Sequence, residues 1–227
     1  MNLKGKRLLI LGGQRISCEI VKHAQDMGIT VGVTDWYELD RSPAKQMADE
    51  AYFESTSDID VMEKLIKENN FDGVITGFTD SVLPYYAEMC ERCNLPAYGT
   101  REQFEVLIDK SRYKALMRDF DVPTIPEYQI NVDDIEASCE SVEFPVLVKP
   151  SDSSGARGIT ICHDSAELAE AVEFAKGASQ TKTVLVEKYM DGAEATIFWI
   201  FDKGEYHVML MGNRHVKENQ GGVIPLP

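Results

Sequence analysis

The stretch FPVLVKPSDSSGARGITIC, residues 144–162, decides how the second half of the chain is interpreted. An apolar run typical of a strand interior carries Lys149 and ends at Pro150, and a loop of serines and glycines follows. Glycines let a backbone approach a ligand closely, and successive N–H groups and hydroxyls can cradle anionic oxygens. The pattern predicts a phosphate-binding loop to which Lys149 adds a positive charge, or else a hairpin turn whose lysine is only solvated.

The phosphate-binding interpretation gives individual loop residues a role. The close backbone approach would come from Gly155 and Gly158, the hydroxyls from Ser153 and Ser154, and a second cation from Arg157. The Walker pattern G-x-x-x-x-G-K-[ST] is absent, so this is not a P-loop.

A second stretch, VEKYMDGAEAT at residues 186–196, points to the same kind of ligand. A strand ending in Glu187, Lys188, Tyr189 and Met190 presents backbone N–H and C=O groups that can hydrogen-bond to an adenine edge. Glu194, shortly after it, can accept hydrogen bonds from ribose hydroxyls, although acidic residues in turns are usually only solvated. The two stretches in this order favour a nucleotide site over chance.

Composition excludes several classes of protein. The chain has 227 residues, 44% hydrophobic and 27% charged, the balance of a soluble globular protein with one large or two modest domains. A formal net charge of −15 argues against a nucleic-acid surface. No run approaches the roughly 18 apolar residues of a membrane helix, and the short run LLIL near the N-terminus fits a first strand better than a signal peptide.

The five cysteines favour reduced thiols and a cytoplasmic location, because their number is odd and they are scattered along the chain. Cys90 and Cys93 have the spacing of a metal-binding pair, but no second Cys/His pair lies at a matching distance. One face of an amphipathic helix explains the spacing equally well, so zinc stays an alternative.

Residues 1–105 alternate strand and helix patterns, which predicts a Rossmann-like α/β domain with a parallel sheet and helices on both faces. Strands are expected at RLLIL, TVGVTDW, EAYFEST, GVITGF and LPAYGT, with helices at 16–27, 59–69 and 81–93. Asp35 ends the second strand, where a ribose-binding acid of a dinucleotide site would lie. Only Gly12 and Gly13 remain of the G-x-G-x-x-G fingerprint, so an NAD-binding oxidoreductase is the less favoured reading.

Residues 106–227 predict an α+β domain. A helix is expected over 103–120, a strand at EFPVLVKP, a helix over 165–176 and a strand at TVLVEKY. ATIFWIFDKGEYHVMLMGN predicts two antiparallel strands joined by a DKGE turn. We expect a first lobe over about 106–183 and the start of a second over 184–227.

With these motifs in place, the chain resembles the ATP-grasp superfamily, which includes biotin carboxylase, carbamoyl-phosphate synthetase and amino-acid ligases. The resemblance covers essentially the whole chain and matches, in order, an early lysine at Lys110 in DKSRYKALM, the strand lysine at Lys149, the hinge at Glu187 and Lys188, and the ribose carboxylate at Glu194. The short sequence RHVK at 214–217 resembles a motif near the triphosphate and suggests His215 and Lys217 as phosphate-side residues.

The resemblance implies an ATP-dependent carboxylate–amine (or thiol) ligase that forms an acyl phosphate, with ATP and Mg²⁺ as cofactors and small-molecule carboxylate and amine substrates. The family's metal ligands lie late in the second lobe, so they are expected downstream of Pro227 and none within this chain, which would then be an inactive fragment. A nucleotide-binding module without turnover remains the alternative. No nucleic acid or membrane is expected as a partner, and a homo-oligomer is compatible with a sequence that does not specify its oligomeric state.

Overall fold

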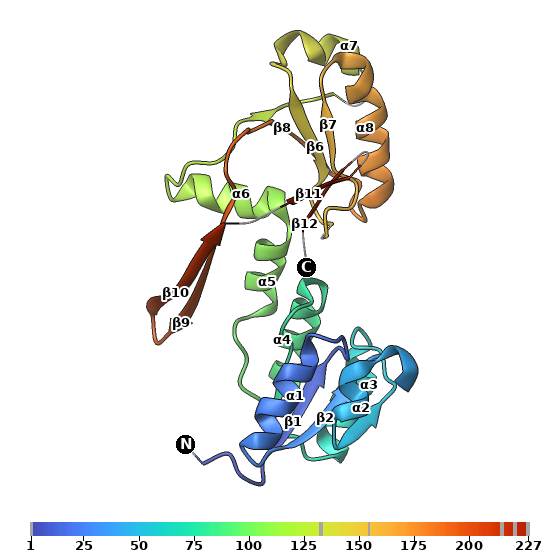
Figure 1. The fold of residues 1–227 in the computed structure, drawn as a ribbon, viewed down its shortest axis with the longest axis vertical. Coiled ribbons are helices and arrows are strands. Elements are labelled where there is room, and N and C mark those ends of the chain that lie inside the picture. The colour runs from blue at the N-terminus through green and yellow to red at the C-terminus, as the bar shows by residue number, and fades with distance from the viewer. Residues whose placement is uncertain (1, 132–133, 154, 214–215, 220–221, 226–227) are drawn as a thin grey trace. The chain divides into compact units, whose positions relative to one another are not determined.

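The structure is a computed structural model that describes residues 2–131, 134–153, 155–213, 216–219 and 222–225. The chain divides into two compact units, Met1–Asp109 and Lys110–Pro227. Each unit is described by itself (Figure 1).

Unit 1 is built on a parallel sheet in the order β3-β2-β1-β4. Its strands are β1 (Arg7–Leu11), β2 (Thr30–Thr34), β3 (Glu50–Tyr52) and β4 (Gly73–Ile75). Its α-helices are α1 (Ser17–Asp26), α2 (Pro43–Met47), α3 (Ile59–Glu68), α4 (Leu83–Arg92) and α5 (Arg101–Ile108), with 3-10 turns η1 (Leu39–Arg41) and η2 (Asp80–Val82).

Alternating side chains of β1 feed two separate cores in unit 1. Leu9 and Leu11 pack with α3, α4 and α5, whereas Ile10 packs with α1 and α2 on the opposite face of the sheet. Both faces are therefore covered, as a parallel sheet of buried apolar strands requires. The predicted Rossmann-like arrangement is confirmed for this unit.

Two expectations at the end of unit 1 are wrong. Residues 95–100 form no strand, because Tyr98 N–H donates to the Tyr86 hydroxyl and Thr100 caps α5 in a capping box with Gln103. The single helix expected over 103–120 is two helices, α5 and α6, separated at Asp109, whose backbone is extended (φ −91°, ψ 114°).

Unit 2 contains a four-stranded sheet in the order β5-β8-β6-β7, with antiparallel neighbours. Its strands are β5 (Glu127–Tyr128), β6 (Val146–Pro150), β7 (Thr160–Cys162) and β8 (Val184–Lys188), and its helices are α6 (Lys110–Asp119), α7 (Ile135–Ser138) and α8 (Ser165–Ala178), with the 3-10 turn η3 (Cys139–Ser141). Val146, Val148 and Val186 pack against α8, so the intervening side chains of β6 and β8 point to the other face. The expected α+β organisation is confirmed.

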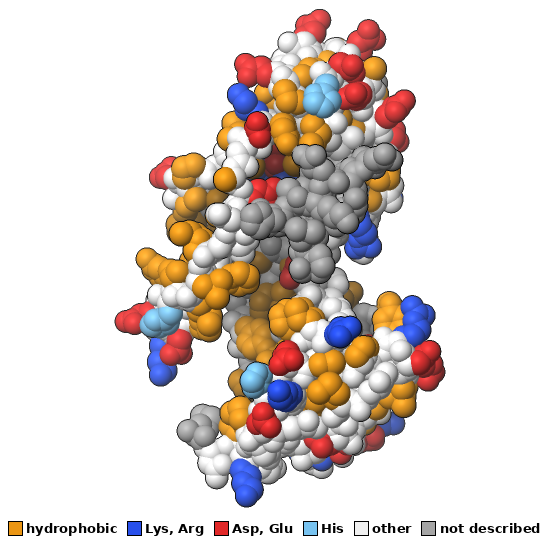
Figure 2. Space-filling model, viewed as in Figure 1, with side chains coloured by type: hydrophobic (Ala, Val, Ile, Leu, Met, Phe, Trp, Pro, Cys, Tyr) orange, Lys and Arg blue, Asp and Glu red, His pale blue; other side chains and the backbone are white. Residues whose placement is uncertain are grey.

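The predicted hairpin follows as β9 (Ala195–Asp202) and β10 (Glu205–Asn213). Its turn residues Lys203 (φ 51°) and Gly204 (φ 85°) both have positive φ, which suits a two-residue hairpin. A further antiparallel pair is β11 (Val216–Asn219) and β12 (Gly222–Pro225). Large apolar side chains of β9 and β10 are exposed, and Figure 2 shows them gathered over this hairpin.

None of the helices in the described part of the chain has both the length and the hydrophobicity that crossing a bilayer requires.

Candidate functional site

Lys149 and Glu187 form the centre of the candidate site. Leu147 and Lys149 of β6 lie on the sheet face away from α8, and Leu147 is the register partner of Glu187 on β8. The Lys149 ammonium lies 2.6 Å from Glu187 Oε2, and only 1% of the Glu187 side chain is exposed. The two residues predicted from separate motifs therefore meet in a buried ion pair.

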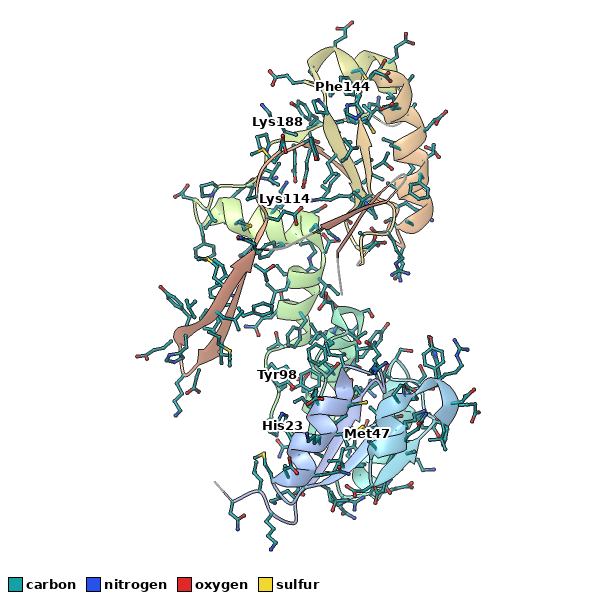
Figure 3. All side chains as sticks on the ribbon, viewed as in Figure 1. His23, Met47, Tyr98, Lys114, Phe144 and Lys188 are labelled. Carbon is teal, nitrogen blue, oxygen red and sulfur yellow. The ribbon has the colours of Figure 1, made fainter. Side chains whose placement is uncertain are left out.

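Lys114 on α6 completes this cluster, which we call the lysine–glutamate chain: Lys149, Glu187, Lys114, Glu127 and Arg118. The Lys114 ammonium lies 2.7 Å from Glu187 Oε1 and 2.6 Å from Glu127 Oε1, while Arg118 pairs with the other Glu127 oxygen. Figure 3 labels Lys114 on its helix. Burial works to raise the pKa of Glu127, but the Lys114 and Arg118 cations outweigh it and hold that pKa below its usual value. Sequence reasoning missed Lys114 and Glu127, although Lys110, Lys114 and Arg118 recur every four residues on one helix face.

Lys110 joins the start of the glycine loop. Its backbone N–H donates to the Ser151 carbonyl at 3.0 Å, and its ammonium donates to the Ser153 carbonyl at 2.6 Å. The structure therefore brings Lys110 and the start of the loop after Lys149 together.

The base of the loop is anchored to its surroundings. Ser151 is fully buried and its N–H donates to the Thr183 carbonyl, while the Ser153 hydroxyl donates to the Ala178 carbonyl at 2.6 Å. Gly158 (φ +76°) packs so closely that an added Cβ would lie 2.7 Å from Ala178 Cβ. The base of the loop is thus held by hydrogen bonds and packing.

The tip of the loop is more open than its base. Gly155 has φ +68° and nothing within 4 Å of an added Cβ, and Arg157 is exposed. Ser154 lies outside the described residues.

The 187–190 segment turns its acid inward and its backbone partly outward. Lys188 N–H donates to the Pro126 carbonyl at 3.0 Å and Tyr189 N–H to the Pro145 carbonyl at 3.1 Å. Met190 is 60% exposed, and Glu194 is exposed immediately before β9. His215 and the side chain of Lys217 lie outside the described residues.

The proposed dinucleotide acid, Asp35, is already committed within unit 1. Its carboxylate accepts from Gly13 N–H at 2.7 Å and from the Ser42 hydroxyl at 2.9 Å, and it pairs with Lys45 at 2.8 Å. Burial works to raise the pKa of Asp35, but hydrogen bonds from Lys45, Ser42 and Gly13 outweigh it and lower that pKa. A carboxylate with these partners has to break them before it can bind a ribose, which counts against the NAD-binding alternative.

The described residues contain no group of three or more His, Cys, Asp or Glu side chains that could hold a metal ion. Cys90 is buried, and burial raises the pKa of its thiol to about 11. Cys90 lies on the buried face of α4, and Cys93 is the half-buried residue that caps the end of this helix.

Comparison with known protein families finds a match to part of the chain. Residues 109–217 match the family described as "Carbamoyl-phosphate synthase L chain, ATP binding domain". Residues 109–217 are therefore similar to this ATP-binding domain, which is of the ATP-grasp class.

Two curated relatives and one solved structure illustrate the likeness. The small subunit of 2-oxoglutarate carboxylase from Hydrogenobacter thermophilus is 27% identical over 92% of this chain and 48% of its own length. The formate-dependent phosphoribosylglycinamide formyltransferase of Sulfurisphaera tokodaii is 28% identical over 88% of this chain and 51% of its own length. This chain thus spans about half the length of these relatives.

The solved structure is the biotin carboxylase domain dimer of the Hydrogenobacter thermophilus 2-oxoglutarate carboxylase, in complex with MgADP, ADP and bicarbonate. It has a TM-score of 0.70 and 24% identity, and the match covers 86% of this chain and 46% of that one. The likeness shows a shared fold.

Proposed function

We propose that this chain provides the ATP-binding part of a ligase that activates a carboxylate, or bicarbonate, as an acyl phosphate for attack by an amine or thiol. The observation that carries the proposal is Lys149, which stands at the end of β6 directly before the glycine loop and opposite the buried Glu187. A partly exposed cation next to backbone with positive φ suits a phosphate group. The similarity of residues 109–217 to an ATP-binding domain supports ATP as the phosphate donor.

The remaining residues take their proposed roles from their positions around Lys149. Lys110 adds a second cation beside the loop, since its ammonium lies on the Ser153 carbonyl. The proposed phosphate contacts of the loop come from Ser153, Ser154, Gly155, Arg157 and Gly158. His215 and Lys217 are proposed as further phosphate-side residues.

The other end of the nucleotide is proposed to lie along the 187–190 backbone. Two N–H groups of this segment are used within the protein, at Lys188 and Tyr189, which leaves Met190 and the carbonyl groups to recognise an adenine edge. Glu194 is proposed to accept hydrogen bonds from the ribose hydroxyls.

In the proposed reaction the carboxylate oxygen attacks the γ-phosphorus of ATP, the bond to the β-phosphate oxygen breaks, and ADP leaves. The amine or thiol then attacks the acyl carbon, loses a proton and displaces inorganic phosphate. The chain's own residues position the reactants and neutralise charge, and no covalent nucleophile of the protein is needed. Mg²⁺, which the related carboxylase domain holds as MgADP, supplies further neutralisation when bound, and no residue of this chain is assigned to it.

The acid substrate is proposed to be small. One curated relative is named as formate-dependent, and the solved biotin carboxylase domain is in complex with bicarbonate. The carbamoyl-phosphate synthetase-like form of the reaction, with bicarbonate as acid, is one member of this class.

Equilibrium binding tests the nucleotide part of the proposal. The 227-residue chain is titrated with ATP and with NAD in magnesium buffer by calorimetry. ATP binding with no NAD binding supports the proposal, and NAD binding without ATP binding overturns it.

Turnover separates the ligase from a module that only binds nucleotide. ADP release is measured with a panel of small carboxylates and bicarbonate, each with and without amines. Release that requires the carboxylate supports acyl-phosphate formation. Binding without release by the 227-residue chain fits both the non-catalytic alternative and the inactive fragment that metal ligands downstream of Pro227 would imply.

A further inference from the structure

Lys114 has no assigned role in the proposed nucleotide site, yet it lies at the centre of the lysine–glutamate chain. We infer that Lys114 is a positioning residue that neutralises Glu187 and so leaves the charge of Lys149 available to a phosphate group. The inference rests on the proposed function, because it presupposes that Lys149 meets a phosphate.

The register of the sheet creates the need for Lys114. Glu127 on β5 is the direct cross-strand partner of Glu187 on β8, and like charges in that position destabilise a sheet. Lys114 reaches between them from α6, within 2.7 Å of one carboxylate and 2.6 Å of the other. One ammonium therefore makes this pairing of two buried acids tolerable.

Lys114 does not itself serve the ligand. Three oxygens lie close to its ammonium, those of the two glutamates and the Ile125 carbonyl at 3.1 Å. The ammonium donates hydrogen bonds to Glu187 and to the Ile125 carbonyl, and it forms an ion pair with Glu127, so its charge is directed at groups of the protein. Only 10% of the side chain is exposed, against 16% for Lys149.

The charges of the lysine–glutamate chain do not cancel. It contains three cations, Lys149, Lys114 and Arg118, and two anions, Glu187 and Glu127. Arg118 pairs with Glu127 and Lys114 is shared between the two glutamates, so we assign the unbalanced positive charge to Lys149 at the loop. Without Lys114 the sum is zero, and Lys149 becomes the sole counter-ion of a carboxylate that is 1% exposed.

The effect of Lys114 should therefore depend on the phosphates of the ligand. In Lys114→Met, the Kd of ATP should rise by about tenfold, the scale of one unit charge acting across a partly desolvated site. The Kd of adenosine should change by less than about twofold, because adenosine carries no charge for Lys149 to meet. Lys114→Arg keeps the charge and should retain most of the ATP affinity.

Glu127 offers a compensating change that does not touch Lys149 or Glu187. Glu127→Gln removes one anion, so alone it should tighten ATP binding by about twofold to threefold and leave adenosine unchanged. Combined with Lys114→Met it restores the surplus charge and should recover most of the lost ATP affinity. This variant also decides the question by itself if Lys114→Met fails to fold in a circular dichroism and thermal unfolding check.

The outcomes separate the inference from the proposed function. Equal losses for ATP and adenosine in Lys114→Met, or no change of ATP affinity in Glu127→Gln, would overturn the inference and make Lys114 merely structural. A wild-type chain that binds no ATP at all would overturn the proposed function, and the inference would fall with it.

Discussion

Each unit of the molecule holds a buried lysine, and the two lysines are used differently. In unit 1, Lys45 pairs with Asp35 at 2.8 Å and donates to the carbonyls of Asp35 and Tyr37 at 2.7 and 2.6 Å. Its side chain is fully buried, and Asp35 also holds Gly13 and Ser42. Lys45 carries one positive charge and Asp35 one negative charge, so this ion pair is neutral. We call Lys45, Asp35, Gly13 and Ser42 the closed clasp.

In unit 2, Lys114 is shared between Glu187 and Glu127. Each acid has one further cation, which is Lys149 for Glu187 and Arg118 for Glu127. The lysine–glutamate chain ends with Lys149 beside a glycine loop. Its three cations exceed its two anions by one positive charge. The neutral Lys45–Asp35 pair fixes a loop. The lysine–glutamate chain, in contrast, has one positive charge that is not cancelled and that can attract a ligand. Under the proposed function, the balance of charge distinguishes Lys45, whose charge is cancelled by Asp35, from Lys149, whose charge is proposed to meet a phosphate.

The largest effect on stability is expected when the Lys45–Asp35 ion pair of the closed clasp is broken. Lys45→Met leaves the Asp35 carboxylate without its cation, which should cost unit 1 about 3–5 kcal/mol of stability, the scale for one partner removed from a buried pair. Hydrogen exchange of the β1 and β2 amides, measured by mass spectrometry, reports this unit separately from unit 2.

The double variant Lys45→Met/Asp35→Asn is the control for lost packing. Because it removes both charges, it should recover a large part of the stability. A double variant as unstable as Lys45→Met would show that the aliphatic part of Lys45, and not its charge, holds the clasp.

The next effect removes the surplus charge of unit 2. Lys149→Ala should weaken ATP binding by about 1–3 kcal/mol, the scale of a lost charge-assisted hydrogen bond. Stability should change little, because Glu187 keeps Lys114 as its counter-ion. Calorimetric titration with ATP measures the loss.

Lys176→Ala is the matched control for Lys149→Ala. It removes an equal charge from the same unit, but Lys176 lies on α8 and pairs with the exposed Glu173. If the two variants bind ATP equally well, Lys149 is not at the phosphate site.

Sequence reasoning singled out one end of the lysine–glutamate chain, Lys149 and Glu187, and missed Lys114 and Glu127. Lys149 and Glu187 were predictable because each stands at a strand end beside a loop pattern that is local in the sequence. The contact of Lys114 with both glutamates depends on the β5·β8 register and on the position of α6. Such long-range pairings leave no local pattern beyond the four-residue spacing along α6.

The same limit explains the helix that was predicted too long. No glycine or proline marks a helix end around Asp109, so the sequence gives no strong stop signal there. The break exists because Lys110 N–H donates to the Ser151 carbonyl, a partner 41 residues away that propensity cannot anticipate. The alternation of apolar residues in unit 1, in contrast, was enough to predict its parallel sheet.

Acid should weaken both charge clusters, and this effect should be smaller than the two above. Burial acts to raise the pKa values of Asp35 and Glu127, but their lysine partners outweigh it and leave both lowered. A lowered folded-state pKa stabilises the fold above the unfolded value, near 3.9 for Asp and 4.3 for Glu, and this stability is lost as pH falls through the folded value. Urea unfolding at pH 6 and at progressively lower pH should therefore show a loss that begins at about pH 4–5.

Asn and Gln variants assign that loss to each unit. Asp35→Asn should flatten the acid dependence of unit 1 only, and Glu127→Gln that of unit 2 only. An unchanged acid profile in both variants would place the titrating groups elsewhere.

The smallest expected effect concerns the loop that the surplus charge faces. Gly155 has φ +68° with nothing within 4 Å of an added Cβ, so Gly155→Ala meets backbone strain but no collision. The expected cost is about 1 kcal/mol of stability, with the Lys149–Glu187 pair intact. Gly13→Ala, in the closed clasp, is the opposite case, because its Cβ would lie 1.8 Å from Ser42 Oγ and 2.7 Å from the Asp35 carboxylate. Thermal unfolding and ATP titration of the two variants should therefore separate stability from binding. Complete loss of ATP binding in a folded Gly155→Ala chain would contradict this reading, and would mean that a phosphate approaches the Gly155 backbone too closely to admit a methyl group.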